Sequence, residues 1–109
     1  MSTSELPDGL SLTFAGATAR VTLPAFEQID AQAYEPVLSQ RHADRIADAV
    51  DEHVKSRRRA GTPVAPLEVR FSGDARYTQA TLRKFRARLS VTLIEHGHEA
   101  TIDDQLSAP

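Results

Sequence analysis

The chain has 109 residues, a formal net charge of −2 at pH 7 and no cysteine. Its length suits one small domain with a single core, and its composition, 40% hydrophobic and 26% charged, excludes a disordered chain. The lack of cysteine excludes disulfides, a thiolate nucleophile and a cysteine-based zinc site.

The sequence also predicts where the protein resides and where its domain begins and ends. No apolar run approaches the roughly 18 residues that a membrane span needs, and residues 1–7 lack the basic start and apolar core of a signal peptide. We therefore expect a cytoplasmic protein with no membrane contact. Residues 10–104 should form a single domain, with residues 1–9 as a flexible lead-in and residues 105–109 as a flexible tail.

Two short segments near the N-terminus alternate between apolar and polar side chains. They cover residues 10–14 and 19–23, and the connection between them contains Gly16. Alternation with period two is typical of a half-buried strand, and a short connection with glycine predicts a β-hairpin. Pro24 ends the second strand because proline cannot donate a hydrogen bond to the sheet.

Residues 25–38 have the least regular pattern in the chain. The apolar residues recur at roughly helical spacing but are interrupted by Pro36; they are Phe26, Ile29, Tyr34, Val37 and Leu38. We expect a short helical turn followed by a loop. Connections this long without regular structure are often functional. The alternative is that these side chains only cap one end of the core.

A first helix is predicted over residues 40–58. Its apolar side chains recur at helical spacing and form a single stripe, which consists of Ala43, Ile46, Ala47, Val50 and Val54. Ser39 is the expected N-cap. Arg57, Arg58 and Arg59 fall in the last turn, where cations complement the negative end of the helix dipole.

The second half of the chain predicts a strand, a helix and a strand. Residues 67–71 alternate, residues 75–96 are periodic like a helix, and residues 98–103 alternate again. This order is that of the unit in which a crossover helix joins two parallel strands. A rival interpretation makes residues 89–102 a hairpin. We prefer the helix, because Gly97 stands where a helix commonly ends on a left-handed residue.

All four predicted strands alternate, which indicates a sheet with one buried face. Strands covered on both faces would be apolar throughout. The fold class is therefore α/β (α+β), a two-layer sandwich of order β-β-α-β-α-β. An N-terminal hairpin and a parallel β-α-β unit share a four-stranded sheet, with both helices on one face. Phe85 and Leu89 should be buried against the sheet, while Arg83 and Lys84 should be exposed.

The leading functional hypothesis is a small non-catalytic protein-interaction, assembly or regulatory subunit that self-associates. Val91 and Ile94 lie outside the main apolar stripe of the second helix, so they need cover from residues 25–38 or from another subunit. The candidate partner surface consists of Phe26, Ile29, Tyr34, Val91 and Ile94.

The alternative function is electrostatic binding of nucleic acid with little sequence specificity. Positions 55 to 88 hold ten basic residues and two acidic ones, which predicts a polarised surface. The candidate basic face consists of Arg57, Arg58, Arg59, Arg76, Arg83, Lys84 and Arg88. No helix-turn-helix, zinc-finger or RNP motif accompanies these residues, so any contact would be to phosphates.

Catalysis and cofactor binding are not predicted. No Ser/His/Asp order is recognisable, and no two carboxylates stand out as an acid and a base, so we lean against an enzyme. His96 and His98 could offer two imidazoles to a metal ion, but no third ligand has diagnostic spacing. We therefore interpret both as surface histidines and expect neither a metal nor a cofactor.

The loop at residues 72–74 lies where an anion could bind. Ser72-Gly73-Asp74 lies between a strand and a helix, where backbone N–H groups can receive an anion. Its single glycine does not make a P-loop, and Asp74 as a helix N-cap explains it more simply. The order of elements is similar to that of anti-sigma-factor-antagonist domains, in which a serine of this kind of loop is phosphorylated. This chain has Ser72-Gly73-Asp74 in place of their Asp-Ser-Ser/Thr-Gly run.

Overall fold

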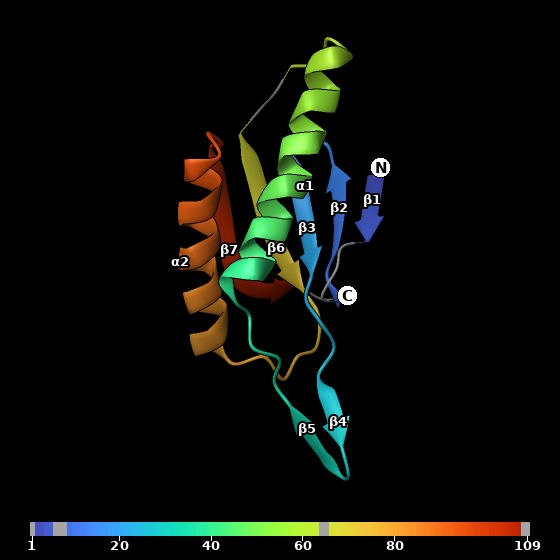
Figure 1. Cartoon of the computed structure of the whole chain (residues 1–109), viewed down its shortest axis with the longest axis vertical. Helices are drawn as coiled ribbons and strands as arrows, with labels where there is room; N and C mark the ends of the chain where they lie inside the picture. Colours follow the sequence, from blue (N-terminus) through green and yellow to red (C-terminus); the bar gives the residue numbers. More distant parts are fainter. Residues whose placement is uncertain (1, 6–8, 64–65, 108–109) are drawn as a thin grey trace.

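A computed structural model describes residues 2–5, 9–63 and 66–107. The elements follow in the order β1 (Ser2–Glu5), β2 (Ser11–Ala15), β3 (Thr18–Thr22), β4 (Glu27–Ile29), β5 (Gln32–Tyr34), α1 (Gln40–Arg59), β6 (Leu67–Ser72), α2 (Gln79–Glu95) and β7 (Ala100–Ser107). Two helices cover one face of a mixed sheet (Figure 1), which confirms the predicted two-layer sandwich.

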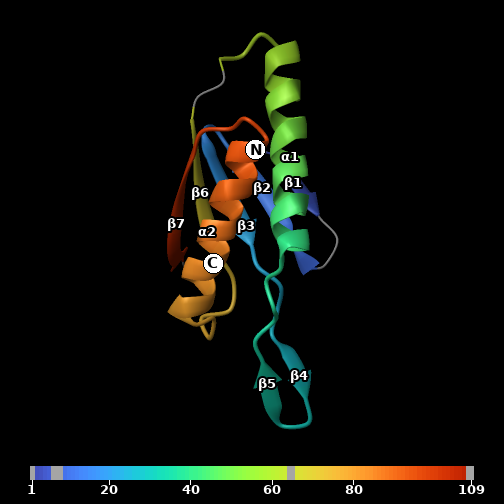
Figure 2. The same cartoon turned by 60° about the vertical axis from the view of Figure 1, so that its left-hand side comes forward.

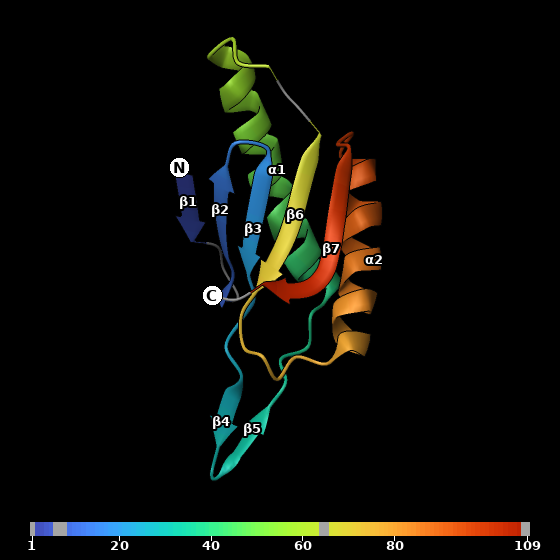
Figure 3. The ribbon, with the colours of Figure 1, turned by 180° about the vertical axis from the view of Figure 1, so that it is seen from behind.

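The main sheet has the strand order β1-β2-β3-β6-β7. β2 and β3 form the predicted antiparallel hairpin, and β6 and β7 are the predicted parallel pair. β3 and β6 are also parallel, with α1 as their crossover, and β1 adds an antiparallel edge strand beside β2. Both crossovers advance across the sheet in one direction, and because such connections are right-handed, both helices lie on one face. Figure 3 shows the other face uncovered by helices.

The core lies between the helices and the alternating side chains of the sheet. The buried apolar strand residues are Leu12, Phe14, Ala19, Val21, Leu67, Val69 and Phe71. The predicted stripe of α1 faces them and is buried. α2 contributes Phe85, 1% exposed, whose ring centroid lies 5.7 Å from that of Phe71. Leu89 is buried as well, and Arg83 and Lys84 are exposed, which confirms the predicted facing of α2.

The two helices begin differently from each other. α1 starts after Ser39 as predicted, and the Ser39 N–H donates to Nδ1 of His42 at 3.1 Å. α2 starts four residues later than predicted, because Asp74 does not cap it. Asp74 Oδ1 instead accepts the Arg76 N–H at 2.9 Å in a local turn. Thr78 is the N-cap, and its hydroxyl accepts the Thr81 N–H at 3.3 Å.

The helix runs to Glu95 and so rules out the rival hairpin over residues 89–102. Gly97 follows with a φ of +82°, the left-handed conformation that a glycine adopts without a steric penalty. This turn leads directly into β7. No helix within the described ranges has both the length and the apolar character to cross a membrane.

The predicted helical turn within residues 25–38 is wrong. β4 and β5 pair there as a second hairpin, which projects along the long axis of the molecule away from the body (Figures 1 and 2). Asp30 and Ala31 are the two connecting residues, and Asp30 has a φ of +54°. Aspartate tolerates this conformation better than most residues, which favours a tight turn here over a helix.

Both ends of the chain contribute strands. Ser2–Glu5 pair with β2, and β7 continues to Ser107, beyond the segment that alternates in the sequence. Residues 1, 6–8 and 108–109 of the predicted lead-in and tail lie outside the described residues.

Candidate functional site

The β4–β5 hairpin places two apolar side chains at the surface. Ile29 is 51% exposed and Tyr34 is 47% exposed. Every residue of β4 is exposed, as are Gln32 and Tyr34 of β5. The hairpin therefore has little of its own core, and its two strands are held together mainly by their backbone pairing.

Phe26, the third candidate on this segment, belongs to the base of the hairpin. Its ring meets the Tyr77 ring edge-on, with 5.0 Å between centroids, and the Arg76 guanidinium carbon lies 4.7 Å from the centroid of Phe26. Phe26 is half-buried by these contacts. Phe26 packs the base of the hairpin against the loop before α2, so it does not belong to the exposed apolar surface formed by Ile29 and Tyr34.

The segment after β5 is tied to the start of α2. Glu35 Oε2 accepts the Thr78 N–H at 2.7 Å, and Oε1 accepts the Thr81 hydroxyl at 2.6 Å. Burial tends to raise the pKa of Glu35, but these hydrogen bonds outweigh it and lower that pKa. A carboxylate from residue 35 thus complements the positive N-terminal end of a helix that begins more than 40 residues later.

A groove of about 320 Å³ opens between this segment and α2. We call it the α2 groove. Its apolar lining includes Pro36, Val37, Leu38 and Phe85, and its basic rim is formed by Lys84 and Arg88. Val37 is 83% exposed, the most exposed large apolar side chain among the described residues. Val37 is not one of the residues that the sequence predicts for the candidate partner surface.

A second hollow of about 440 Å³ continues the α2 groove along the helix. Lys84 and Arg88 border both, and Val91 lies in the second. Val91 is 56% exposed and Ile94 is 68% exposed, so residues 25–38 do not cover them. Gln40 crosses from α1 to this region and donates to Thr92 Oγ1 at 2.8 Å.

The candidate basic residues do not form one face. Arg57, Arg58 and Arg59 occupy the last turn of α1, at the end of the molecule opposite the hairpin (Figure 1). Arg83 and Lys84 lie on α2 and are exposed.

Arg76 and Arg88, the remaining two basic candidates, each contact another side chain. Arg88 Nη1 donates to Gln40 Oε1 at 3.4 Å. Arg76 is paired with Asp74, with 2.6 Å between Arg76 Nη2 and Asp74 Oδ2. Hydrogen bonds from Arg76 lower the pKa of Asp74 to about 2.

The loop after β6 does not present its serine. Ser72 is buried, 4% exposed, and its hydroxyl oxygen lies 3.2 Å from Thr22 Oγ1. Phosphorylation needs an accessible hydroxyl. Asp74 also places a negative charge in this loop, which opposes the binding of an anion. The geometry therefore favours a structural role for Ser72-Gly73-Asp74.

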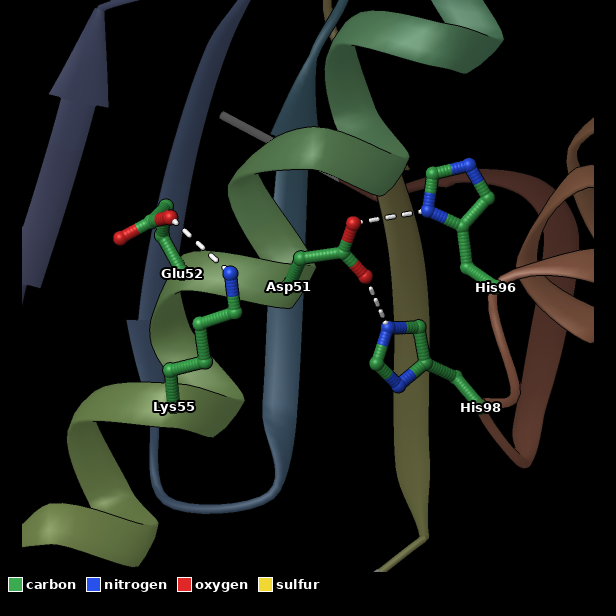
Figure 4. Close-up of polar contacts among 5 residues, drawn as sticks. All are labelled: Asp51, Glu52, Lys55, His96 and His98. Carbon is green, nitrogen blue, oxygen red and sulfur yellow. Dashed lines mark hydrogen bonds and ion pairs between the residues drawn. The ribbon is translucent and has the colours of Figure 1, made fainter.

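A cluster of ionisable side chains joins α1 to the turn before β7 (Figure 4). His96 Nδ1 lies 2.8 Å from Asp51 Oδ2, and His98 Nε2 lies 2.6 Å from Asp51 Oδ1. A carboxylate only accepts hydrogen bonds, so each imidazole donates an N–H to Asp51. Asp48, one turn earlier on α1, has an oxygen within 4.8 Å of ligand atoms of both Asp51 and His96.

These contacts shift the ionisation of the cluster. The hydrogen bond to Asp51 raises the pKa of His96, and the charges of Asp51, Asp48 and Asp44 add to this effect. Burial tends to raise the pKa of Asp51, but hydrogen bonds from His98 and His96 outweigh it and lower that pKa. The chain thus gathers two imidazoles and two carboxylates on one partly exposed surface.

The sequence indicates the two histidines as possible metal ligands but does not indicate their carboxylate partner. Asp51 lies 45 residues before His96, and no spacing rule links them. The only sequence signal was the spacing of Asp44, Asp48 and Asp51, which places three carboxylates on one face of α1.

Neither a protein-family model, a curated protein nor a solved structure matches this chain.

Proposed function

We propose that the protein is a small, non-catalytic cytoplasmic interaction subunit that assembles as a homodimer. In this dimer, the β4–β5 hairpin of each copy occupies the α2 groove of the other copy. An assembly or regulatory role follows from such a contact, because association would control access to the surface of α2.

The projecting hairpin is the observation that carries this proposal. An isolated two-stranded hairpin is only marginally stable in water, and this one exposes about half of Ile29 and Tyr34. A partner surface that covers both side chains would remove apolar area from water and hold the two strands in place. The α2 groove has apolar side chains that could cover Ile29 and Tyr34 of a second copy.

Charge supports a second copy as the occupant of the groove. The hairpin and its flanks carry Glu27, Asp30 and Glu35, and no basic residue occurs from position 21 to position 40. The rim of the α2 groove carries Lys84 and Arg88. The chain therefore has an acidic apolar projection and a basic apolar groove. A two-fold axis would let this contact form twice in one dimer.

Sedimentation velocity on the purified chain over a wide concentration range tests the proposal. We expect wild type to dimerise and Ile29→Ser/Tyr34→Ser to remain monomeric. Lys84→Glu should also weaken the dimer, and adding Asp30→Lys to it should restore association through the reversed charge pair. Arg20→Glu is the matched control, because Arg20 is exposed on the sheet face that no helix covers.

Three outcomes would refute the dimer. They are a wild-type monomer at the highest concentration, an equal loss of association in Arg20→Glu, and a charge reversal that does not restore association although circular dichroism shows that the proteins are folded.

Anisotropy with labelled duplex DNA tests the nucleic-acid alternative in parallel. Sub-micromolar binding at about 150 mM salt, with a steep loss as salt rises, would favour that alternative.

A further inference from the structure

The cluster around Asp51 lies apart from the proposed dimer contact and has a chemistry of its own. Asp48 and Asp51 are three residues apart on α1, so their side chains share a face of the helix. His96, the C-cap of α2, faces the same place, and Gly97 then turns the chain toward His98. Asp48, Asp51 and His96 each present one oxygen or nitrogen, and these three atoms lie within 4.8 Å of one another.

The distance between the ligand atoms of His96 and Asp51 suits a shared cation. The 2.8 Å between His96 Nδ1 and Asp51 Oδ2 is close to the separation of two ligands on one ion. Two ligand atoms at about 2.1 Å from a metal and at right angles to each other are about 3.0 Å apart. Small side-chain movements, with the Nδ1 proton released to solvent or moved to Nε2, would therefore replace the N–H···O hydrogen bond with two metal–ligand bonds.

His98 contacts the other carboxylate oxygen of Asp51. Its Nε2 lies 2.6 Å from Asp51 Oδ1, and it leaves Oδ2 to face His96 (Figure 4). A side chain that holds a metal-binding carboxylate in one orientation strengthens metal binding without touching the metal. Glu52, the neighbour of Asp51, pairs instead with Lys55 at 3.8 Å and points elsewhere.

We propose that Asp48, Asp51 and His96 bind one divalent first-row transition-metal ion, with His98 as a positioning residue for Asp51. Imidazole and carboxylate ligands suit Zn²⁺, Co²⁺, Ni²⁺ and Mn²⁺, and two carboxylates neutralise the charge of such an ion. The site supplies three ligands and is partly exposed, so water completes the coordination. The ion would link α1 to the turn between α2 and β7.

Calorimetric titration of the metal-free chain with Zn²⁺, and absorption of its Co²⁺ complex, test the site. We expect one ion per chain in wild type. Asp48→Asn and His96→Gln should each weaken binding by at least about tenfold, the scale of losses around metal sites. Asp48 is exposed, so its variant tests the site without disturbing the core. Glu52→Gln is the matched control and should bind like wild type.

The positioning role of His98 has its own readout. His98→Gln should weaken Zn²⁺ binding, yet the saturated Co²⁺ complex should keep the wild-type absorption spectrum, because the ligand atoms are unchanged. His96→Gln should change that spectrum. Three results would overturn the proposal. They are no saturable binding by folded wild type, unchanged affinity in both Asp48→Asn and His96→Gln, and an equal loss in Glu52→Gln.

Discussion

The Tyr77 hydroxyl donates a hydrogen bond of 2.5 Å to the carbonyl oxygen of Pro24, across 53 residues of sequence. Both residues are buried, and burial raises the pKa of Tyr77, with the charges of Glu35 and Asp74 adding to this effect. The bond joins the loop before α2 to the chain where it leaves β3 for the β4–β5 hairpin. It therefore helps to fix the direction in which the hairpin projects.

Tyr77→Phe should lower the free energy of unfolding by about 1–3 kcal/mol, because it leaves the Pro24 carbonyl buried without this donor. Urea denaturation measures the change. Tyr34→Phe is the control, since the Tyr34 hydroxyl bonds Gln32 at the exposed surface and its loss should change stability little. Equal midpoints for Tyr77→Phe and wild type would show that the bond contributes nothing.

Phe85→Ala should destabilise the fold by about 3–5 kcal/mol, the cost of lost burial and of the cavity left behind. Phe85 is 1% exposed and contacts the ring of Phe71 on the sheet. Arg83→Ala, on the exposed face of the same helix, should stay within about 0.5 kcal/mol of wild type. Chemical denaturation compares the two variants, and similar midpoints would contradict the facing of α2.

Glu35→Gln should lower stability at pH 7 by about 1 kcal/mol, the scale of a helix-capping contact. The pKa of Glu35 is lowered in the folded chain, so ionised Glu35 stabilises the fold above the unfolded pKa. That contribution is lost as pH falls through the folded pKa. The stability difference between wild type and Glu35→Gln should therefore shrink on acidification.

Thermal unfolding of both proteins from pH 7 to the acid limit of folding gives this difference directly. Glu27→Gln is the control, because Glu27 is exposed on β4. A difference that stays constant with pH would show that the Glu35 charge does not stabilise the start of α2.

His53→Phe should raise the melting temperature. The His53 ring stacks on Phe14 with 3.8 Å between centroids and 2° between planes, and a phenyl ring can keep that contact. His53 Nε2 is buried and finds no hydrogen-bond partner among the described residues. An unsatisfied buried polar atom costs about 1–3 kcal/mol, and the substitution removes it.

Scanning calorimetry at pH 8 measures the effect of His53→Phe. His53→Ala serves as the comparison, because it removes the stacking contact together with the nitrogen and should be destabilising. A melting temperature of His53→Phe below that of wild type would indicate that the histidine nitrogen is satisfied in solution.

The sandwich could be predicted because its strands keep strict alternation. Leu67, Val69 and Phe71 alternate with polar residues, and that pattern alone decides that one face is buried and that both helices share it. The strands of the β4–β5 hairpin do not show this alternation. Ile29 and Tyr34 are exposed, so no buried face imposed a period of two, and the spacing resembled a helical turn.

The start of α2 and the candidate sites could not be predicted, because they depend on contacts between segments that are distant in the sequence. Asp74 has the residue type of an N-cap, but it bonds Arg76, and Thr78 caps α2 with help from Glu35. Asp51 meets His96 only because the sheet brings α1 beside the end of α2. Such contacts depend on the whole fold, and no local sequence pattern predicts them.

The irregular pairing of β7 affects how copies of the chain can meet. Arg70 of β6 pairs with Asp103, but the next residue pairs with Leu106, so Asp104 and Gln105 are extra residues on β7. The Asp104 carbonyl accepts from Gln79 at 3.3 Å, and the Gln105 N–H donates to the Asp103 side chain at 3.0 Å. Bulged, charged edges of this kind resist the addition of a foreign strand. The β7 edge is thus protected against edge-to-edge aggregation, and copies of the protein should not stack there into a continuous sheet.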